Sequence, residues 1–204
     1  MTRQIHTAII QPLLTLAIAW LMNVGAQAQT VAVKTNLLYD ATLTPNLGVE
    51  LGLGKKHTAQ LFYSLNLWEH PKGKSSDTQW KHWQLGGEYR WWFCSKFNGH
   101  FLGVHAMGGE FDMAKVKHFK LPLYNWPKDF DTKRYEGWNA GAGVTYGYQW
   151  ILGKHWNLEA SVGAGYQYIH YKKLPCTECG NVEETGHKHY VGIDKLALSL
   201  MYVF

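Results

Sequence analysis

Apolar and polar residues alternate with a period of two along most of the chain from Val31 onward. Trp156–Tyr168 places every second residue on an apolar face, and its opposite face carries small and polar residues. Trp138–Trp150 repeats the pattern, and Leu196–Phe204 gathers leucine and aromatic residues on one side. Sustained alternation of this kind predicts β-strands with two chemically different faces.

Five further segments alternate more weakly: Val31–Tyr39, Asn46–Leu53, Thr58–Trp68, Lys81–Trp92 and Phe101–Glu110. Together with the three segments above, they make eight candidate strands. Several of the eight exceed the usual soluble strand of about 5–6 residues. Tilted strands of about 9–11 residues are what a bilayer-spanning barrel needs.

The apolar face carries aromatic residues at its ends, as at Trp138 and Trp150, whereas the opposite face is rich in glycine. Aromatic girdles around an apolar band are typical of transmembrane barrels. Predicted connections also sort by side: three are short (54–57, 94–99, 151–155), and those opposite are mostly longer (40–45, 69–79, 112–136, 172–188). Short periplasmic turns and longer outer loops have this asymmetry. A soluble sandwich or lipocalin-like barrel gives no reason for it.

The sequence therefore predicts an all-β fold, an eight-stranded antiparallel transmembrane β-barrel over residues 29–204. Residues Met1–Ala28 precede it, with Arg3, an apolar stretch from Ala8 to Val24 and a small-residue Ala-Gln-Ala ending. This organisation is typical of a cleavable secretory signal peptide. The chain ends in Phe204, the last of the leucine and aromatic residues that share the outward side of the final strand. This ending resembles the C-terminal signal of bacterial outer-membrane barrels.

Composition fits this prediction. The chain has 204 residues, of which 30 are aromatic and 21 are glycine, yet its mean hydropathy is −0.27. Aromatics on a lipid face, glycines in a narrow lumen and polar loops would together produce that average. Loss of Arg3 with the signal peptide leaves 19 basic and 15 acidic side chains, which gives no case for a nucleic-acid partner.

Five charged residues fall on the inward face: Lys34, Glu50, Glu88, Arg90 and Glu159. A barrel of eight strands has an interior just wide enough for side chains to fill. The charges are expected to form a closed salt-bridge network, because buried charges need partners. A narrow proton or ion path, or a paired-carboxylate site, is the alternative; general diffusion is not expected.

Three segments carry a family resemblance: Val31–Asp40 (VAVKTNLLYD), Thr44–Glu50 (TPNLGVE) and Trp83–Trp92 (WQLGGEYRWW). The chain resembles an uncharacterised outer-membrane barrel family of Bacteroidetes-type bacteria that carries a domain of unknown function. Some members are encoded beside fimbrial genes. The resemblance covers essentially the whole mature chain, implies an outer-membrane location in a Gram-negative bacterium, and offers no catalytic residues.

Two candidate sites lie in predicted outer loops. Cys176, Cys179, His187 and His189 could complete a tetrahedral zinc site, although the spacing is not that of a standard finger. A disulfide between the two cysteines, or two free thiols, is the alternative. The basic loop before residue 136 could bind lipopolysaccharide phosphates, or could simply be solvated; its cations are Lys115, Lys117, Lys120, Lys128, Lys133 and Arg134.

No Gly-x-Ser-x-Gly nucleophile motif occurs in the chain. The expected function is therefore non-catalytic: a monomeric outer-membrane protein with a structural or surface-attachment role through its loops. Outer-membrane lipid, lipopolysaccharide and fimbrial or other surface proteins are the expected partners, and no cofactor is expected. The alternative is a lipid-modifying or hydrolytic barrel enzyme.

Overall fold

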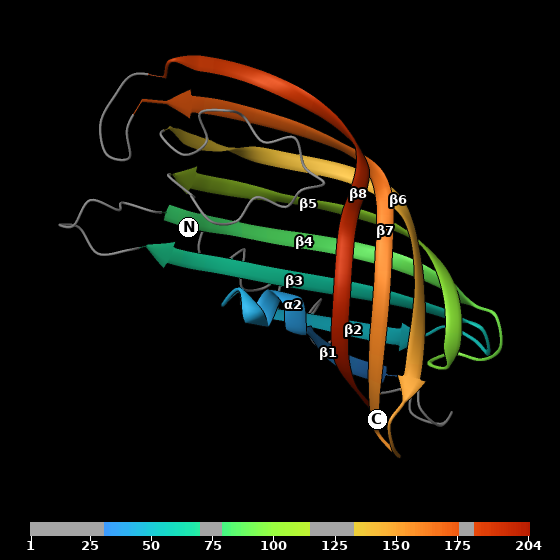
Figure 1. The fold of residues 1–204 in the computed structure, drawn as a ribbon. Helices are drawn as coiled ribbons and strands as arrows, with labels where there is room; N and C mark the ends of the chain where they lie inside the picture. The colour runs from blue at the N-terminus through green and yellow to red at the C-terminus, as the bar shows by residue number, and fades with distance from the viewer. Residues whose placement is uncertain (1–30, 70–78, 115–132, 176–181) are drawn as a thin grey trace, which may run out of the picture.

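The computed structural model describes residues 31–69, 79–114, 133–175 and 182–204 (Figure 1). The predicted signal peptide, residues 1–28, lies outside them. The described elements are β1 (Val31–Asn36), α2 (Leu37–Ala41), β2 (Asn46–Gly52), β3 (His57–Glu69), β4 (Gln79–Trp92), β5 (Gly99–Ala114), β6 (Arg134–Ile151), β7 (Trp156–Leu174) and β8 (Glu184–Val203).

The eight strands form one closed antiparallel barrel in sequence order, which confirms the predicted all-β, eight-stranded antiparallel architecture. β1 closes the ring by pairing with β8 from Ala32↔Val203 to Asn36↔Ser199. Over this paired stretch, closure removes the sheet edges that an open sheet would expose. β1 and β2 have 6 and 7 residues, whereas β5 to β8 have 16 to 20, so one side of the barrel wall is much taller.

The barrel has an apolar outside and a polar inside over its middle. Val144 is 61% exposed on the outer face, and its neighbours in register, Val104 and Ala164, face the same way. Inward positions on several strands hold buried polar side chains, including Gln60 on β3, Gln149 on β6 and Ser199 on β8. This distribution is the reverse of a soluble protein's.

Two belts of outward aromatic rings border the middle of the barrel. The turn-side belt lies near the short connections and includes Trp91, Phe93, Trp150, Trp156 and Phe204, all exposed. The loop-side belt lies toward the long connections and includes Trp83, Trp138, Tyr166 and Tyr168 together with His187 and His189. Trp138 and Tyr168 pack at 5.4 Å between ring centroids. The aromatic ends predicted from the sequence are therefore present.

Glycine lets neighbouring strands approach closely on the inner face. Gly143 and Gly165 are opposite each other in the β6–β7 ladder. A Cβ at Gly143 would lie 2.5 Å from the Ala164 carbonyl oxygen and 2.8 Å from Gly165 Cα. Backbone atoms cannot move aside as a flexible side chain could, so this position requires glycine.

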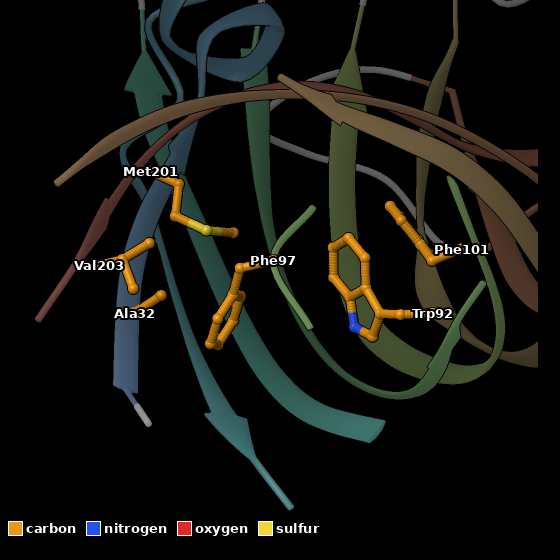
Figure 2. Packing of buried hydrophobic residues seen from close by; sticks show 6 residues of the cluster. All are labelled: Ala32, Trp92, Phe97, Phe101, Met201 and Val203. Atoms are coloured by element: carbon orange, nitrogen blue, oxygen red, sulfur yellow. The ribbon is translucent and has the colours of Figure 1, made fainter. Parts of the chain in front are cut away.

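An apolar cluster closes the lumen at the turn side (Figure 2). It consists of Ala32, Trp92, Phe97, Phe101, Met201 and Val203. Phe97 comes from the β4–β5 turn, where its φ of 62° lies in the left-handed region. The Trp92 indole N–H donates to the Thr58 hydroxyl at 2.9 Å, which satisfies the one polar atom that the ring buries.

The predicted first strand, Val31–Tyr39, is wrong at its end, because residues 37–41 form the helix α2. The Asn36 side chain accepts a hydrogen bond from the Leu38 N–H at 3.2 Å. A side-chain acceptor at this position caps a helix and satisfies a backbone N–H of the first turn, which has no acceptor within the helix.

The strands beside the long loops extend further than predicted. The segments predicted as loops, 112–136 and 172–188, begin and end as paired strand. In this region the pattern inverts, since Phe111 and Met113 face the lumen while Glu110 and Asp112 face outward.

Candidate functional site

A network of charged side chains fills the lumen above the apolar cluster. Arg90 is its centre and is fully buried. Its guanidinium donates to Glu88 at 2.9 Å, to Glu50 at 2.9 Å, and to both oxygens of Glu159 at 2.7 and 3.0 Å. Its Cζ also lies 4.3 Å from the centre of the Phe101 ring, so Arg90 connects the charged network to the apolar cluster below it.

Two lysines complete the network. Lys34 Nζ donates to Glu50 at 2.7 Å and to Glu159 at 3.1 Å, and Lys195 pairs with Glu88. Three carboxylates therefore face three cations, and each carboxylate contacts at least two donors. Removal of charges from water is costly unless partners and hydrogen bonds compensate it, and this network supplies both.

All five charges predicted to point inward do so, and they form the predicted closed network. Lys195 was not singled out, although it has the same phase as Ala197 and Ser199 and one further step of the β8 pattern would have found it. Asp194 could not be found in that way. The β7–β8 register shifts at Gly163/Ala164, where Lys195 and Ile193 are the partners. Asp194 is therefore the extra residue of a bulge, which re-aims a side chain.

Asp194 joins a second polar cluster through His105. His105 Nε2 lies 3.1 Å from Asp194 Oδ2, and its Nδ1 lies 2.8 Å from the Thr145 hydroxyl. Gln167 donates to the same Asp194 oxygen at 3.3 Å. Enzymes that use a side-chain nucleophile often align a hydroxyl, an imidazole and a carboxylate in this order. Here Thr145 is 1% exposed and lines none of the cavities described below, so the geometry fits a structural cluster.

A cavity of about 340 Å³ occupies the loop-side half of the lumen. Apolar side chains from β5, β6 and β7 dominate its wall: Met107, Phe111, Met113, Tyr135, Ile169 and Tyr171. Gln84, Asn139, Gln167 and Asp194 lie at its inner end, and Glu184 and Lys188 lie at its outer end. A smaller void of about 50 Å³ lies deeper, between Tyr39 and the network. A third hollow, of about 490 Å³, lies on the outer surface around Trp83 and Trp138.

The candidate zinc ligands are only partly described. His187 and His189 are exposed on β8, with ring centroids 5.6 Å apart. Each ring packs on a tyrosine of β7, and His189 Nδ1 is hydrogen-bonded to the Tyr166 hydroxyl. Cys176 and Cys179 lie outside the described residues, so the zinc site stays a prediction. Among the described residues there is no group of three or more His, Cys, Asp or Glu that could hold a metal ion.

Two residues of the basic loop are described, and both are paired. Lys133 Nζ lies 2.6 Å from Glu183, and Arg134 lies 2.7 Å from Asp112. The lysines at 115, 117, 120 and 128 lie outside the described residues, so binding to lipopolysaccharide stays a prediction. In the parts of the chain that the structure covers, no helix has the length and hydropathy to cross a membrane.

The class of protein is thus an eight-stranded antiparallel barrel with an ionic lumen closed at one end. Residues 13–204 match the family model described as "Protein of unknown function (DUF3575)", and the chain belongs to that family. This agrees with the resemblance to an uncharacterised family that carries a domain of unknown function. No curated protein and no solved structure matches the chain.

Proposed function

We propose that the protein is a non-catalytic outer-membrane barrel of a Gram-negative bacterium that serves surface attachment. One observation carries the location: an outward apolar band between two aromatic belts, around a polar lumen. Water outside this band would meet many large apolar side chains, whereas lipid would satisfy them. Aromatic rings with a polar tip suit the two membrane interfaces.

The lumen supports a scaffold role rather than a pore. The ionic network fills its middle, and the apolar cluster closes its turn-side end. A wide aqueous channel requires about 16 strands. The tall β5–β8 wall then supports the long connections beyond the loop-side belt, where a fimbrial protein or another surface protein would bind.

Arginine substitutions test the location. Val144→Arg places a charge at mid-height on the outer face, and Leu152→Arg places one in a turn, where the native leucine is equally exposed at 60%. In lipid vesicles we expect Val144→Arg to destabilise the barrel by about 2–4 kcal/mol and Leu152→Arg by less than about 1 kcal/mol. Equal costs for the two variants in urea titrations would overturn the membrane location.

A pull-down tests the attachment role. A deletion strain that carries a tagged copy would be cross-linked on intact cells, and the captured proteins would be identified by mass spectrometry. Enrichment of a fimbrial or other surface protein is expected, and its loss should follow replacement of the long loops by short turns. Capture that is unchanged in the loop-shortened variant would contradict attachment through the loops.

Lipid A mass spectra of the deletion strain address the enzymatic alternative. The non-catalytic proposal predicts spectra identical to wild type. A missing acyl or phosphate modification that the intact gene restores would establish an enzyme instead.

A further inference from the structure

The loop-side cavity is lined by residues whose polarity pattern is reversed relative to the rest of the barrel. Along β5, Met107, Phe111 and Met113 face the lumen, while Glu110 and Asp112 face outward. Along β7, Ile169 and Tyr171 line the cavity, and the intervening position is His170. Over the ionic network β7 turns polar residues inward, among them Glu159 and Ser161. The charged middle of the lumen therefore separates this apolar lining from the apolar cluster at the turn side.

The lining of the cavity is long. It extends from Met107 to Met113, six residues along β5, which corresponds to about 20 Å along the strand. An extended hydrocarbon chain could contact this lining along its length, whereas a compact ring system would contact only a part of it.

The polar groups at the inner end of the cavity already bind one another. Asn139 donates to Gln167 at 3.4 Å, and Gln167 donates to Asp194, which in turn contacts His105. In the part of the chain that the structure describes, the buried Asp194 Oδ1 has no hydrogen-bond partner. The inner end therefore offers one acceptor to a donor group, and its negative charge disfavours an anionic head group there. Glu184 and Lys188 at the outer end carry both signs of charge, so the outer end selects neither an acidic nor a basic head.

The cavity also reaches the outer surface beside β8. β1 pairs with β8 only over residues 199–203, so within the described chain β8 has no ladder partner on that side from 184 to 198. Asn36 covers the end of this stretch by bonding the Leu196 carbonyl at 3.3 Å and the Leu198 N–H at 3.1 Å. Ile193 lines the cavity and is 42% exposed, so a chain could slide in past it.

We propose that this cavity binds a single hydrocarbon chain, such as the acyl or alkyl chain of an amphiphile, with its head at the Glu184 end. The methionine and aromatic lining suits such a ligand, because thioether side chains adapt to irregular apolar shapes. A volume near the lower end of the usual 300–1,000 Å³ range for ligand pockets excludes a lipid with several chains buried at once. The proposal depends on the lumen alone and not on the attachment role.

The three methionines downstream of the predicted signal peptide provide the readout. Met107 and Met113 line the cavity, whereas Met201 lies in the apolar cluster at the other end of the lumen. The folded mature chain, labelled with ¹³C at the methionine methyl groups, would be titrated in nanodiscs with 1-decanol. We expect saturable shifts of the Met107 and Met113 signals and no shift of Met201.

1-Adamantanol is the matched probe, because it has the same number of carbon atoms and one hydroxyl but a compact shape. We expect it to bind at least tenfold more weakly than 1-decanol. Decanol that moves none of the three signals, that moves all three alike, or that binds no better than adamantanol would overturn the proposal.

Two tryptophan variants locate the site. Ile169→Trp fills the cavity from β7 and should abolish the decanol response of Met107 and Met113. Val191→Trp adds the same ring on β8 at a position that is 79% exposed, and should leave the response unchanged. An unaltered Met201 signal confirms that each variant is folded, and a normal decanol response in folded Ile169→Trp would contradict the assignment.

Discussion

Arg90→Met is the sharpest test of the ionic network. The Arg90 side chain donates four hydrogen bonds to three carboxylates, at distances between 2.7 and 3.0 Å. Methionine keeps an unbranched apolar stem beside Phe101 but removes the charge. Glu50, Glu88 and Glu159 would then share only the two amines of Lys34 and Lys195.

The expected loss of stability is about 3–5 kcal/mol, the cost of breaking a buried ion pair by removing one partner. That is a large part of the roughly 5–15 kcal/mol that stabilises a typical folded domain. The cost comes mainly from the carboxylate that remains without a matching cation. Arg90→Met combined with Glu159→Gln restores equal numbers of acidic and basic groups, so the double variant should recover at least about half of the loss.

The assay is urea unfolding of the mature chain in lipid vesicles, followed by tryptophan fluorescence and by the migration of folded and unfolded bands in cold SDS gels. Lys133→Met is the control, because Lys133 forms a rim pair with Glu183 that is about one-third exposed. An exposed pair contributes less than about 1 kcal/mol. The reasoning fails if Arg90→Met costs no more than Lys133→Met, or if the double variant is no more stable than the single one.

Three further outcomes are expected. Gly143→Val should destabilise the barrel by about 3 kcal/mol or prevent folding, because the new Cβ would overlap the Ala164 carbonyl. Gly153→Val is the control: it lies in a turn where an added Cβ would have nothing within 4 Å, so it should fold normally on the same gels. Equal behaviour of the two variants would refute the close approach of the strands at Gly143. Mass spectrometry of protein from the membrane fraction should give an N-terminus at Gln29, and a retained residue 1–28 segment would contradict the signal peptide. The zinc hypothesis predicts one bound zinc ion per reduced chain and loss of that ion in Cys176→Ser. The disulfide alternative predicts no zinc; without reductant, maleimide should then label only Cys94, which is the free, exposed thiol of the described chain.

The strand pattern was readable because each strand has one apolar and one polar face over the middle of the barrel. Trp156–Tyr168 and Trp138–Trp150 alternate without interruption, and both are strand in the structure. The same phase identified Lys34, Glu50, Glu88, Arg90 and Glu159 as inward residues. Which carboxylate meets which cation depends on strands far apart in the sequence, so those pairings could not be read from it.

Two features of the tall wall escaped the sequence for physical reasons. The β8 bulge adds Asp194 and shifts the alternation by one residue, so the period-two signal can be followed back only to Lys195. Beyond the loop-side belt the outside becomes polar and the lumen apolar, and this reversal looks like irregular loop sequence. The helix α2 was missed because its five residues are too few for a helical period.

The sequence by itself determined the number of strands, their two faces, the parity of short and long connections and five of the charged residues in the lumen. Each of these follows from the local period of two, which depends only on the alternation of side chains along a strand. Tertiary structure alone decided the salt-bridge partners, the apolar cluster around Phe97, the short β1–β2 wall and the loop-side cavity. These depend on closure of the ring and on strand register, which bring together residues that no local pattern connects.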